Sequence, residues 1–296
     1  MRHTFRTAAG LVAAAVGIAV AIPAQANASA TPANRIATSP YVAMGDSYSS
    51  AAGVNPLVPT APPACSRSTL NYAHDIAAVT KPSKFTDITC SGATTSDFFS
   101  SQTTGQPAQL SALNSRTRFV TMTIGGNDEN VFVDSFFGCV QVSLTTGDVM
   151  GDPCKQKFGD TFVNEIRTQT LRHLVTALTA VRRKAPHATV VILGYPQILP
   201  EKGQLACYSS MPISMGDVPW LEEEQEVLNN VVYRAATRTG AHFINMGPSS
   251  RNHNACEPPN QRWIEPATNP INAFPVHPNA TGEAAMAHQT LLQLGL

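Results

Sequence analysis

A serine stands where a catalytic nucleophile would be exposed. Residues 41–44 (YVAM) form a short apolar run, and the chain continues through Gly45 and Asp46 to Ser47. Such a run is typical of a buried strand, and a serine just past its end lies at the edge of the sheet. A hydroxyl activated by a neighbouring base attacks a carbonyl carbon and forms a covalent intermediate. Ser47 is therefore a candidate nucleophile, although these three letters alone also fit a simple turn.

Partners for this nucleophile occur at three later points of the chain. Gly92 follows a second apolar run, and Asn127 follows a third. The backbone N–H groups of Ser47 and Gly92, with the side-chain amide of Asn127, predict an oxyanion hole for the charge that develops on an attacked carbonyl oxygen. His277 lies in a loop before the last helical segment, where an imidazole is able to act as general base.

Alternating apolar and amphipathic segments position these residues. Five short apolar runs each precede a loop that contains glycine: residues 41–44, 85–89, 118–124, 188–193 and 241–245. Apolar residues recur at helical spacing in 161–184, 220–239 and 281–295, and we interpret the acidic residues 222–224 as a solvated helix start. The alternation predicts an α/β fold with a central parallel sheet of about five strands. Sites in such folds form beyond the carboxyl ends of the strands, where the glycine loops lie.

The order and spacing of these residues resemble the SGNH (GDSL) hydrolase superfamily, and most closely its secreted actinobacterial lipase and esterase branch. The four sequence blocks of that family correspond to residues 45–49, 91–93, 125–128 and 277–278. One block would be a weak signal, whereas four in order are specific, and the resemblance spans essentially all of the chain after its N-terminal segment. It implies a three-layer α/β/α sandwich that is flavodoxin-like.

The resemblance also implies roles for individual residues. Ser47 is the expected nucleophile and His277 the expected general base, while Ser47 N–H, Gly92 N–H and Asn127 Nδ2 bind the oxyanion. Asp46 is expected to hold the nucleophile turn through backbone hydrogen bonds and not to act as an acid. The implied reaction is hydrolysis of a carboxylic ester, an acyl glycerol or related lipid, through an acyl-enzyme.

One position departs from the general family pattern. That pattern has an aspartate three residues before the histidine, and here Phe274 occupies the position. A phenylalanine side chain accepts no hydrogen bond, whereas a backbone carbonyl is able to fix the imidazole tautomer. The actinobacterial branch uses a main-chain oxygen in this way. We therefore predict a Ser–His dyad with the carbonyl of Phe274 or Pro275 as orienting group. A carboxylate from elsewhere in the chain is the alternative.

The N-terminus has the pattern of a secretory signal peptide. Arg2 and Arg6 precede an uncharged apolar run at residues 9–22, and small-residue cleavage sites follow it. The run is shorter than the roughly 20 residues of a membrane span. We expect residues 1–28 to be a Sec-type signal peptide and residues 29–296 to form a single domain, secreted to the extracellular space. An uncleaved anchor is the alternative.

Six cysteines follow the signal segment, and an even number in an exported chain predicts disulfides. Sequential pairing closes the shortest loops, and we therefore predict the pairs Cys65–Cys90, Cys139–Cys154 and Cys207–Cys256. A metal cluster is disfavoured because the chain has no C-x-x-C motif and no Cys/His spacing typical of zinc. We expect no metal and no cofactor.

Charge and composition limit the partners. Twenty Lys and Arg balance twenty Asp and Glu, so the chain lacks the basic excess of nucleic-acid-binding proteins. We expect a small-molecule or lipid ester as substrate, no nucleic acid, no stable membrane insertion and a monomer. Apolar loop residues are candidates for an acyl pocket, with ordinary packing as the favoured interpretation for any single one and Phe136 and Phe137 as the best candidates: Phe132, Phe136, Phe137, Met211, Ile213 and Met215. A phospholipase A1, a carbohydrate O-acetyl esterase and a non-catalytic secreted binding protein on the same scaffold are the alternative functions.

Overall fold

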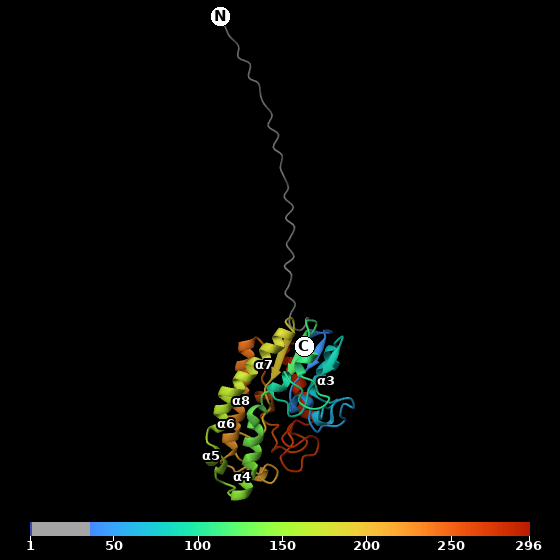
Figure 1. Cartoon of the computed structure of the whole chain (residues 1–296). Coiled ribbons are helices and arrows are strands. Elements are labelled where there is room, and N and C mark those ends of the chain that lie inside the picture. The colour runs from blue at the N-terminus through green and yellow to red at the C-terminus, as the bar shows by residue number, and fades with distance from the viewer. Residues whose placement is uncertain (2–35) are drawn as a thin grey trace. The chain divides into compact units, whose positions relative to one another are not determined.

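The computed structural model describes Met1 and residues 36–296. The predicted signal peptide, residues 1–28, falls outside the described residues apart from Met1. Within residues 36–296, strands and helices alternate along the chain, and the helices surround the strands (Figure 1). This is the arrangement that the apolar runs and amphipathic segments predict.

Five parallel strands form the central sheet. They are β1 (Tyr41–Ala43), β2 (Phe85–Asp87), β3 (Phe119–Met122), β4 (Thr189–Leu193) and β5 (His242–Ile244). Their spatial order is β2-β1-β3-β4-β5, and all four pairings are parallel. This is the flavodoxin-like order, in which the direction of winding reverses between β1 and β3 and opens a crevice beyond their carboxyl ends. The predicted fold class is confirmed.

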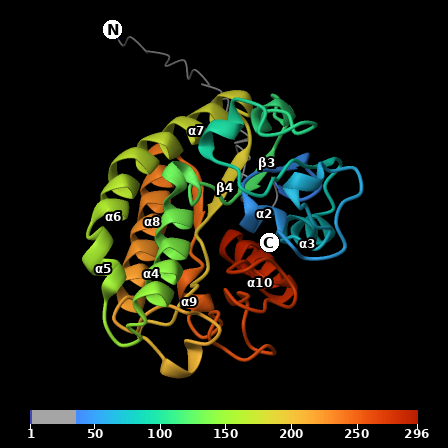
Figure 2. The ribbon, with the colours of Figure 1, turned by 60° about the horizontal axis from the view of Figure 1, so that its bottom comes forward.

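Helices lie on both sides of the sheet. The α-helices are α2 (Ser47–Ser50), α3 (Tyr72–Thr80), α4 (Gly138–Thr146), α5 (Pro153–Phe158), α6 (Thr161–Glu165), α7 (Leu171–Lys184), α8 (Val218–Thr239), α9 (Gly247–Ser250) and α10 (Ala280–Leu294). Figure 2 shows α7 and α8 side by side on one face and α3 with α10 on the other. The central strands are almost completely buried between these layers, which explains why they read as continuous apolar runs.

Two of the expected helices differ from the sequence pattern in detail. The segment 161–184 is one continuous helical path, but Ile166–Thr170 is π-helical between α6 and α7. Helix α8 begins at Val218, so Glu222–Glu224 lies beyond its first turn. The interpretation of this acidic run as a solvated helix start is wrong for Glu224, which is only 5% exposed because it faces the interior.

Three disulfides join neighbouring cysteines in the chain. They are Cys65–Cys90, Cys139–Cys154 and Cys207–Cys256, and the described residues contain no free cysteine. These are the pairs that the shortest loops predict. The first disulfide joins Cys90, in the loop after β2, to Cys65. The backbone N–H of Cys90 also donates to the carbonyl of Gly45, so this loop lies close to the loop after β1.

Candidate active site

Ser47 is the first residue of α2, directly beyond the carboxyl end of β1. Gly45 makes the turn from strand to helix possible, with φ of +118° and no space for a side chain against the carbonyl of Thr123. Asp46 is the N-cap of α2, and its Oδ1 accepts a hydrogen bond from Tyr48 N–H at 3.0 Å. The local sequence therefore holds Ser47 at the edge of the sheet by a glycine turn and a helix cap.

Asp46 is committed to structure by its hydrogen bonds. Thr123 Oγ1 donates to Oδ1 at 2.6 Å, and Tyr195 O–H donates to Oδ2 at 2.6 Å. Burial raises the pKa of Asp46 above its usual value, and these hydrogen bonds, which favour the charged form, oppose the rise. Both oxygens are occupied, so the side chain holds the turn that contains Ser47.

The loops after β2 and β3 are tied to each other beside Ser47. Asp128 accepts two hydrogen bonds from Thr95, at 2.8 Å from its N–H and 2.8 Å from its hydroxyl. Asn127 Nδ2 donates to the carbonyl of Ala93 at 3.0 Å, one residue past Gly92. An amide nitrogen carries two hydrogens, so the bond to Ala93 uses only one of the two N–H groups of Asn127. This bond places Asn127 next to the residue that follows Gly92, and Asn127 lines the same pocket as Ser47.

His277 is held by the backbone just before it. Its Nδ1 lies 2.7 Å from the carbonyl oxygen of Pro275, while the carbonyl of Phe274 accepts the backbone N–H of His277 at 3.2 Å. Of the two predicted carbonyl groups, only that of Pro275 therefore lies at hydrogen-bonding distance from a ring nitrogen of His277. A proton on Nδ1, donated to this carbonyl, leaves Nε2 as the unprotonated acceptor. Burial lowers the pKa of His277, which the Pro275 contact partly opposes.

Tyr48 connects the histidine loop to the nucleophile turn. Its hydroxyl donates to the carbonyl of Val276 at 2.6 Å, and its ring centroid lies 5.2 Å from that of His277. The residue next to Ser47 thereby places the imidazole. Within residues 36–296, Ser47 Oγ makes no hydrogen bond to His277; such catalytic bonds often tighten only when substrate is bound.

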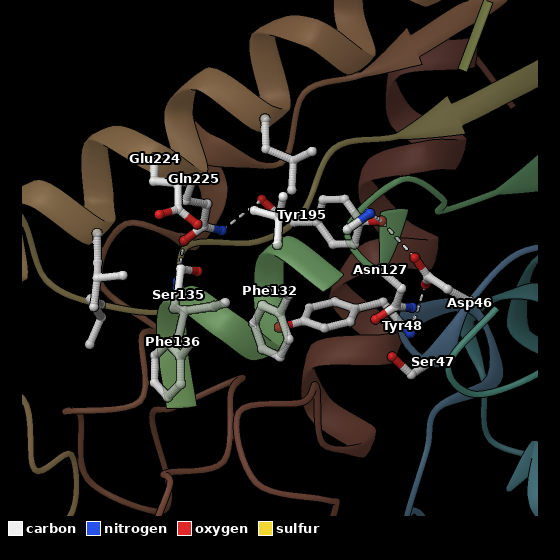
Figure 3. Close-up of a pocket in the computed structure, with 16 residues that line it drawn as sticks. Asp46, Ser47, Tyr48, Asn127, Phe132, Ser135, Phe136, Tyr195, Glu224 and Gln225 are labelled. Carbon is white, nitrogen blue, oxygen red and sulfur yellow. Dashed lines mark hydrogen bonds between the residues drawn. The ribbon is translucent and has the colours of Figure 1, made fainter. Parts of the chain in front are cut away.

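A narrow apolar pocket of about 60 Å³ opens beside Ser47 (Figure 3). Among its lining residues are Asn127, Phe132, Phe136, Leu221 and Leu228. Phe132 and Phe136 stack with centroids 5.7 Å apart, and Phe132 also meets the edge of His277 at 6.4 Å.

The other residues expected to form an acyl pocket lie elsewhere. Phe137 is 38% exposed and does not line this pocket. Met211 and Ile213 are buried in the main core, and Met215 is not among the lining residues. None of these four candidates lines the pocket, because adjacent positions on a helix point in different directions and because an apolar residue in a long loop packs inward as readily as it lines a cleft.

Sequence reasoning missed two residues of the site. Tyr195 O–H accepts from Gly126 N–H at 2.9 Å and donates to Asp46, so it joins the first and third sequence blocks. Its position just past β4, at the same edge of the sheet as Ser47, was an available signal. Glu224 lines the pocket from α8, and no local pattern distinguished it from the exposed glutamate beside it.

One cluster has the residue types of a metal site. Ligand atoms of Asp128, Glu129 and His173 lie within 4.8 Å of one another. Each carboxylate already has protein partners: Thr95 binds Asp128, while Thr170 and His173 bind Glu129 at 2.7 and 2.8 Å. The cluster therefore has the form of a hydrogen-bonded brace between the loop after β3 and the helical path that leads into α7.

A serine and a histidine beyond the carboxyl edge of a flavodoxin-like sheet are the groups that a serine hydrolase of this fold needs for acyl transfer. The chain belongs to the GDSL-like lipase/acylhydrolase family, whose model matches residues 43–285. This membership confirms the family that the four sequence blocks resemble.

Similar proteins agree with this assignment. The chain is 44% identical to Lipase 2 of Streptomyces coelicolor over 283 residues, which cover 96% of this chain and 95% of that protein. The structure is similar to that of phospholipase A1 from Streptomyces albidoflavus NA297, with a TM-score of 0.71, 28% identity and coverage of 87% and 99% of the two chains. It is also similar to the extracellular lipase of Streptomyces rimosus, with a TM-score of 0.69, 27% identity and coverage of 86% and 98%. The protein is a carboxylic ester hydrolase of the lipase/esterase type.

Among the described residues, no helix is both long and apolar enough to span a membrane.

Proposed function

We propose that this protein is a secreted serine esterase or lipase that cleaves lipid esters with a Ser–His dyad. The observation that carries the proposal is the 2.7 Å contact between His277 Nδ1 and the carbonyl of Pro275, beside the turn that presents Ser47. This contact supplies what the aspartate of the general family pattern would supply: a fixed tautomer with Nε2 free to accept a proton. Phe274 is then compatible with catalysis.

The proposed reaction proceeds by acyl transfer. His277 Nε2 takes the proton of Ser47 as Oγ forms a bond to the carbonyl carbon of the ester. The tetrahedral intermediate collapses, the bond to the leaving alcohol breaks, and the imidazolium returns its proton to that alcohol. Water then attacks the acyl-enzyme with His277 again acting as base, which releases the acid and restores the Ser47 hydroxyl.

The oxyanion of both intermediates is proposed to bind three donors. These are the backbone N–H groups of Ser47 and Gly92 and the free N–H of Asn127. Ser47 N–H lies at the N-terminus of α2, and Gly92 adopts φ of +75° in the loop fixed by the Cys65–Cys90 disulfide. Fixed donors of this kind need little reorganisation as charge develops.

The pocket supports a lipid acyl group as the part of the substrate that is recognised. Its aromatic and leucine side chains would remove the methylene groups of an acyl chain from water, at roughly 0.8 kcal/mol for each. The structural similarity to a phospholipase A1 favours phospholipids as a second candidate substrate class. Secretion is proposed from the signal-like N-terminus, the three disulfides and the likeness to an extracellular lipase.

Labelling with a fluorophosphonate tests the dyad directly. The disulfide-bonded protein is treated with the probe, the adduct is located by peptide mass spectrometry, and hydrolysis of p-nitrophenyl esters is followed in parallel. We expect one adduct, on Ser47, with matching loss of hydrolysis. Ser47→Ala should lose both labelling and activity, whereas Ser111→Ala, at an exposed position away from the turn, should keep both. An adduct elsewhere, or an active Ser47→Ala, would overturn the proposal.

A further inference from the structure

A buried carboxyl group interrupts the apolar wall of the pocket. Glu224 on α8 is 5% exposed, yet its Oε2 has no hydrogen-bond partner among the described residues. The carboxyl has one side-chain hydrogen bond, to Ser135, and the nearest charge that affects it is another carboxylate, Glu165. Figure 3 shows Glu224 and Ser135 at the opposite end of the pocket from Ser47, with Phe132 between them. A buried polar atom without a partner requires a physical account.

The neighbouring residues of α8 give no structural reason for a carboxyl group at position 224. Leu221 and Leu228 lie three residues before and four residues after Glu224, on the same face of α8, and both line the pocket. A leucine at position 224 would complete an apolar stripe and bury no unpaired oxygen. No ion pair to Glu224 forms within residues 36–296. Besides Ser135 and Glu165, the carboxyl group therefore adjoins the pocket that it lines.

Resting on the proposed acyl pocket, we propose that Glu224 is a specificity residue that binds a hydroxyl group carried by the acyl chain of the substrate. Phe132, Phe136 and the two leucines would contact the methylene groups, and the hydroxyl would occupy the free hydrogen-bonding position of the carboxyl. The enzyme would then select esters of hydroxylated fatty acids over esters of plain alkanoic acids.

A hydroxyl group fits this position better than a charged group. An ammonium group would leave its water shell to lie against apolar walls, which is unfavourable unless it is fully paired. Burial raises the pKa of Glu224 to about 7, so both of its protonation states are populated near neutral pH. A hydroxyl is able to donate to the carboxylate and to accept from the carboxylic acid, so it matches either state.

Matched ester pairs test this assignment. The two substrates of each pair are p-nitrophenyl esters, an ω-hydroxyalkanoate and the alkanoate with a methyl group in place of the hydroxyl. The ratio of their kcat/KM values is measured over rising chain length on the disulfide-bonded protein. At the length that reaches Glu224, we expect the hydroxylated ester to be favoured about tenfold to a hundredfold, the effect of a hydrogen bond to a charged group.

Variants at and beside this position complete the test. Glu224→Leu should lower the ratio to about one or below, because it removes the acceptor. Glu224→Gln, which keeps the shape and a carbonyl acceptor, should retain part of the preference. Glu223→Gln is the matched control, because Glu223 is exposed on the same turn and should leave the ratio unchanged. Fluorophosphonate labelling of Ser47 in every variant reports on the dyad separately.

The outcomes separate the two proposals. Absence of labelling and hydrolysis in the wild-type protein would refute the dyad itself. Normal labelling with no hydroxyl preference at any length, or with the same preference in Glu224→Leu, would refute the role of Glu224 alone. A stronger preference for ω-amino esters would also overturn the hydroxyl assignment. If Glu224→Leu does not fold, the ratio in Glu224→Gln decides.

Discussion

Tyr195 O–H lies 2.6 Å from Oδ2 of Asp46, a residue 149 positions earlier in the chain. The same tyrosine oxygen accepts the backbone N–H of Gly126 at 2.9 Å. One buried hydroxyl therefore joins the turn that presents Ser47 to the loop that presents Asn127. The relative position of Ser47 and Asn127 depends on this bridge as well as on the strands.

Tyr195→Phe removes the bridge without changing the ring. We expect a loss of about 1–3 kcal/mol in the free energy of unfolding, because a buried carboxylate loses a donor and Gly126 N–H loses its acceptor. Urea unfolding with the disulfides intact measures this loss. Tyr233→Phe is the control, because Tyr233 is half exposed on α8 and should give a change near zero. Equal stabilities of the two variants would show that the bridge contributes nothing.

Asn127→Ala tests the side-chain donor of the oxyanion hole. We expect kcat for ester hydrolysis to fall about a hundredfold to a thousandfold, equivalent to roughly 2.7–4 kcal/mol, with little change in KM. The reason is that the amide contacts the oxygen only after charge has developed on it. Asn164→Ala, an exposed position in α6, should retain full activity. A change in KM alone would indicate that Asn127 binds the ground state of the substrate.

The pH profile follows from the environment of His277. Catalysis needs the neutral imidazole, and burial lowers its pKa below the usual 6.5. Activity should therefore persist as the pH falls through 6.5 and disappear only below it. The measurement is kcat/KM against pH under conditions where chemistry limits turnover. An acid limb above 6.5, or a flat profile across this range, would contradict the assignment of His277 as base.

Substitution of Phe274 should move this acid limb in a predictable direction. Its ring packs against the edge of His277 with centroids 6.2 Å apart. Phe274→Ala admits water, which reduces the cost of the imidazolium and moves the limb up towards 6.5. Phe274→Asp adds a negative charge as well and should move it higher still. The three pH profiles give the order directly, and an unchanged limb in both variants would show that Phe274 does not shield the imidazole.

The disulfides should differ in their effect on catalysis. Replacing the cysteines of a pair with serine should cost about 2–4 kcal/mol of stability in either the Cys65–Cys90 or the Cys207–Cys256 bridge. Only the first bridge adjoins Gly92. Its loss, and not that of the other bridge, should therefore also lower kcat when kcat is measured at a temperature at which the variants remain folded. Thermal unfolding and ester kinetics on the two double variants measure both effects. An equal fall in kcat would mean that the first bridge has no special role in placing the loop.

Local sequence signals were enough to predict the fold and to name the candidate groups of the site. The strands are short buried runs followed by glycine loops, and these signals are local, so β1 to β5 could be placed from them. Ser47, Gly92, Asn127 and His277 all follow such elements or precede α10, and the sheet edge is where parallel strands bring loops together. The cysteine pairing was also predictable, because short loops close most easily.

Features that depend on contacts between distant segments could not be predicted from local signals. The choice of Pro275 over Phe274 as the carbonyl beside His277 depends on the backbone path of that loop, including Val276 at φ of +56°. The bridge through Tyr195 depends on the packing of β4 beside β3. In the sequence, Glu224 is indistinguishable from Glu222 and Glu223. It is buried because the orientation of α8 about its axis turns position 224 towards the pocket. Periodicity reports which face of an element is apolar, but the partners that this face meets are set by packing across the whole domain.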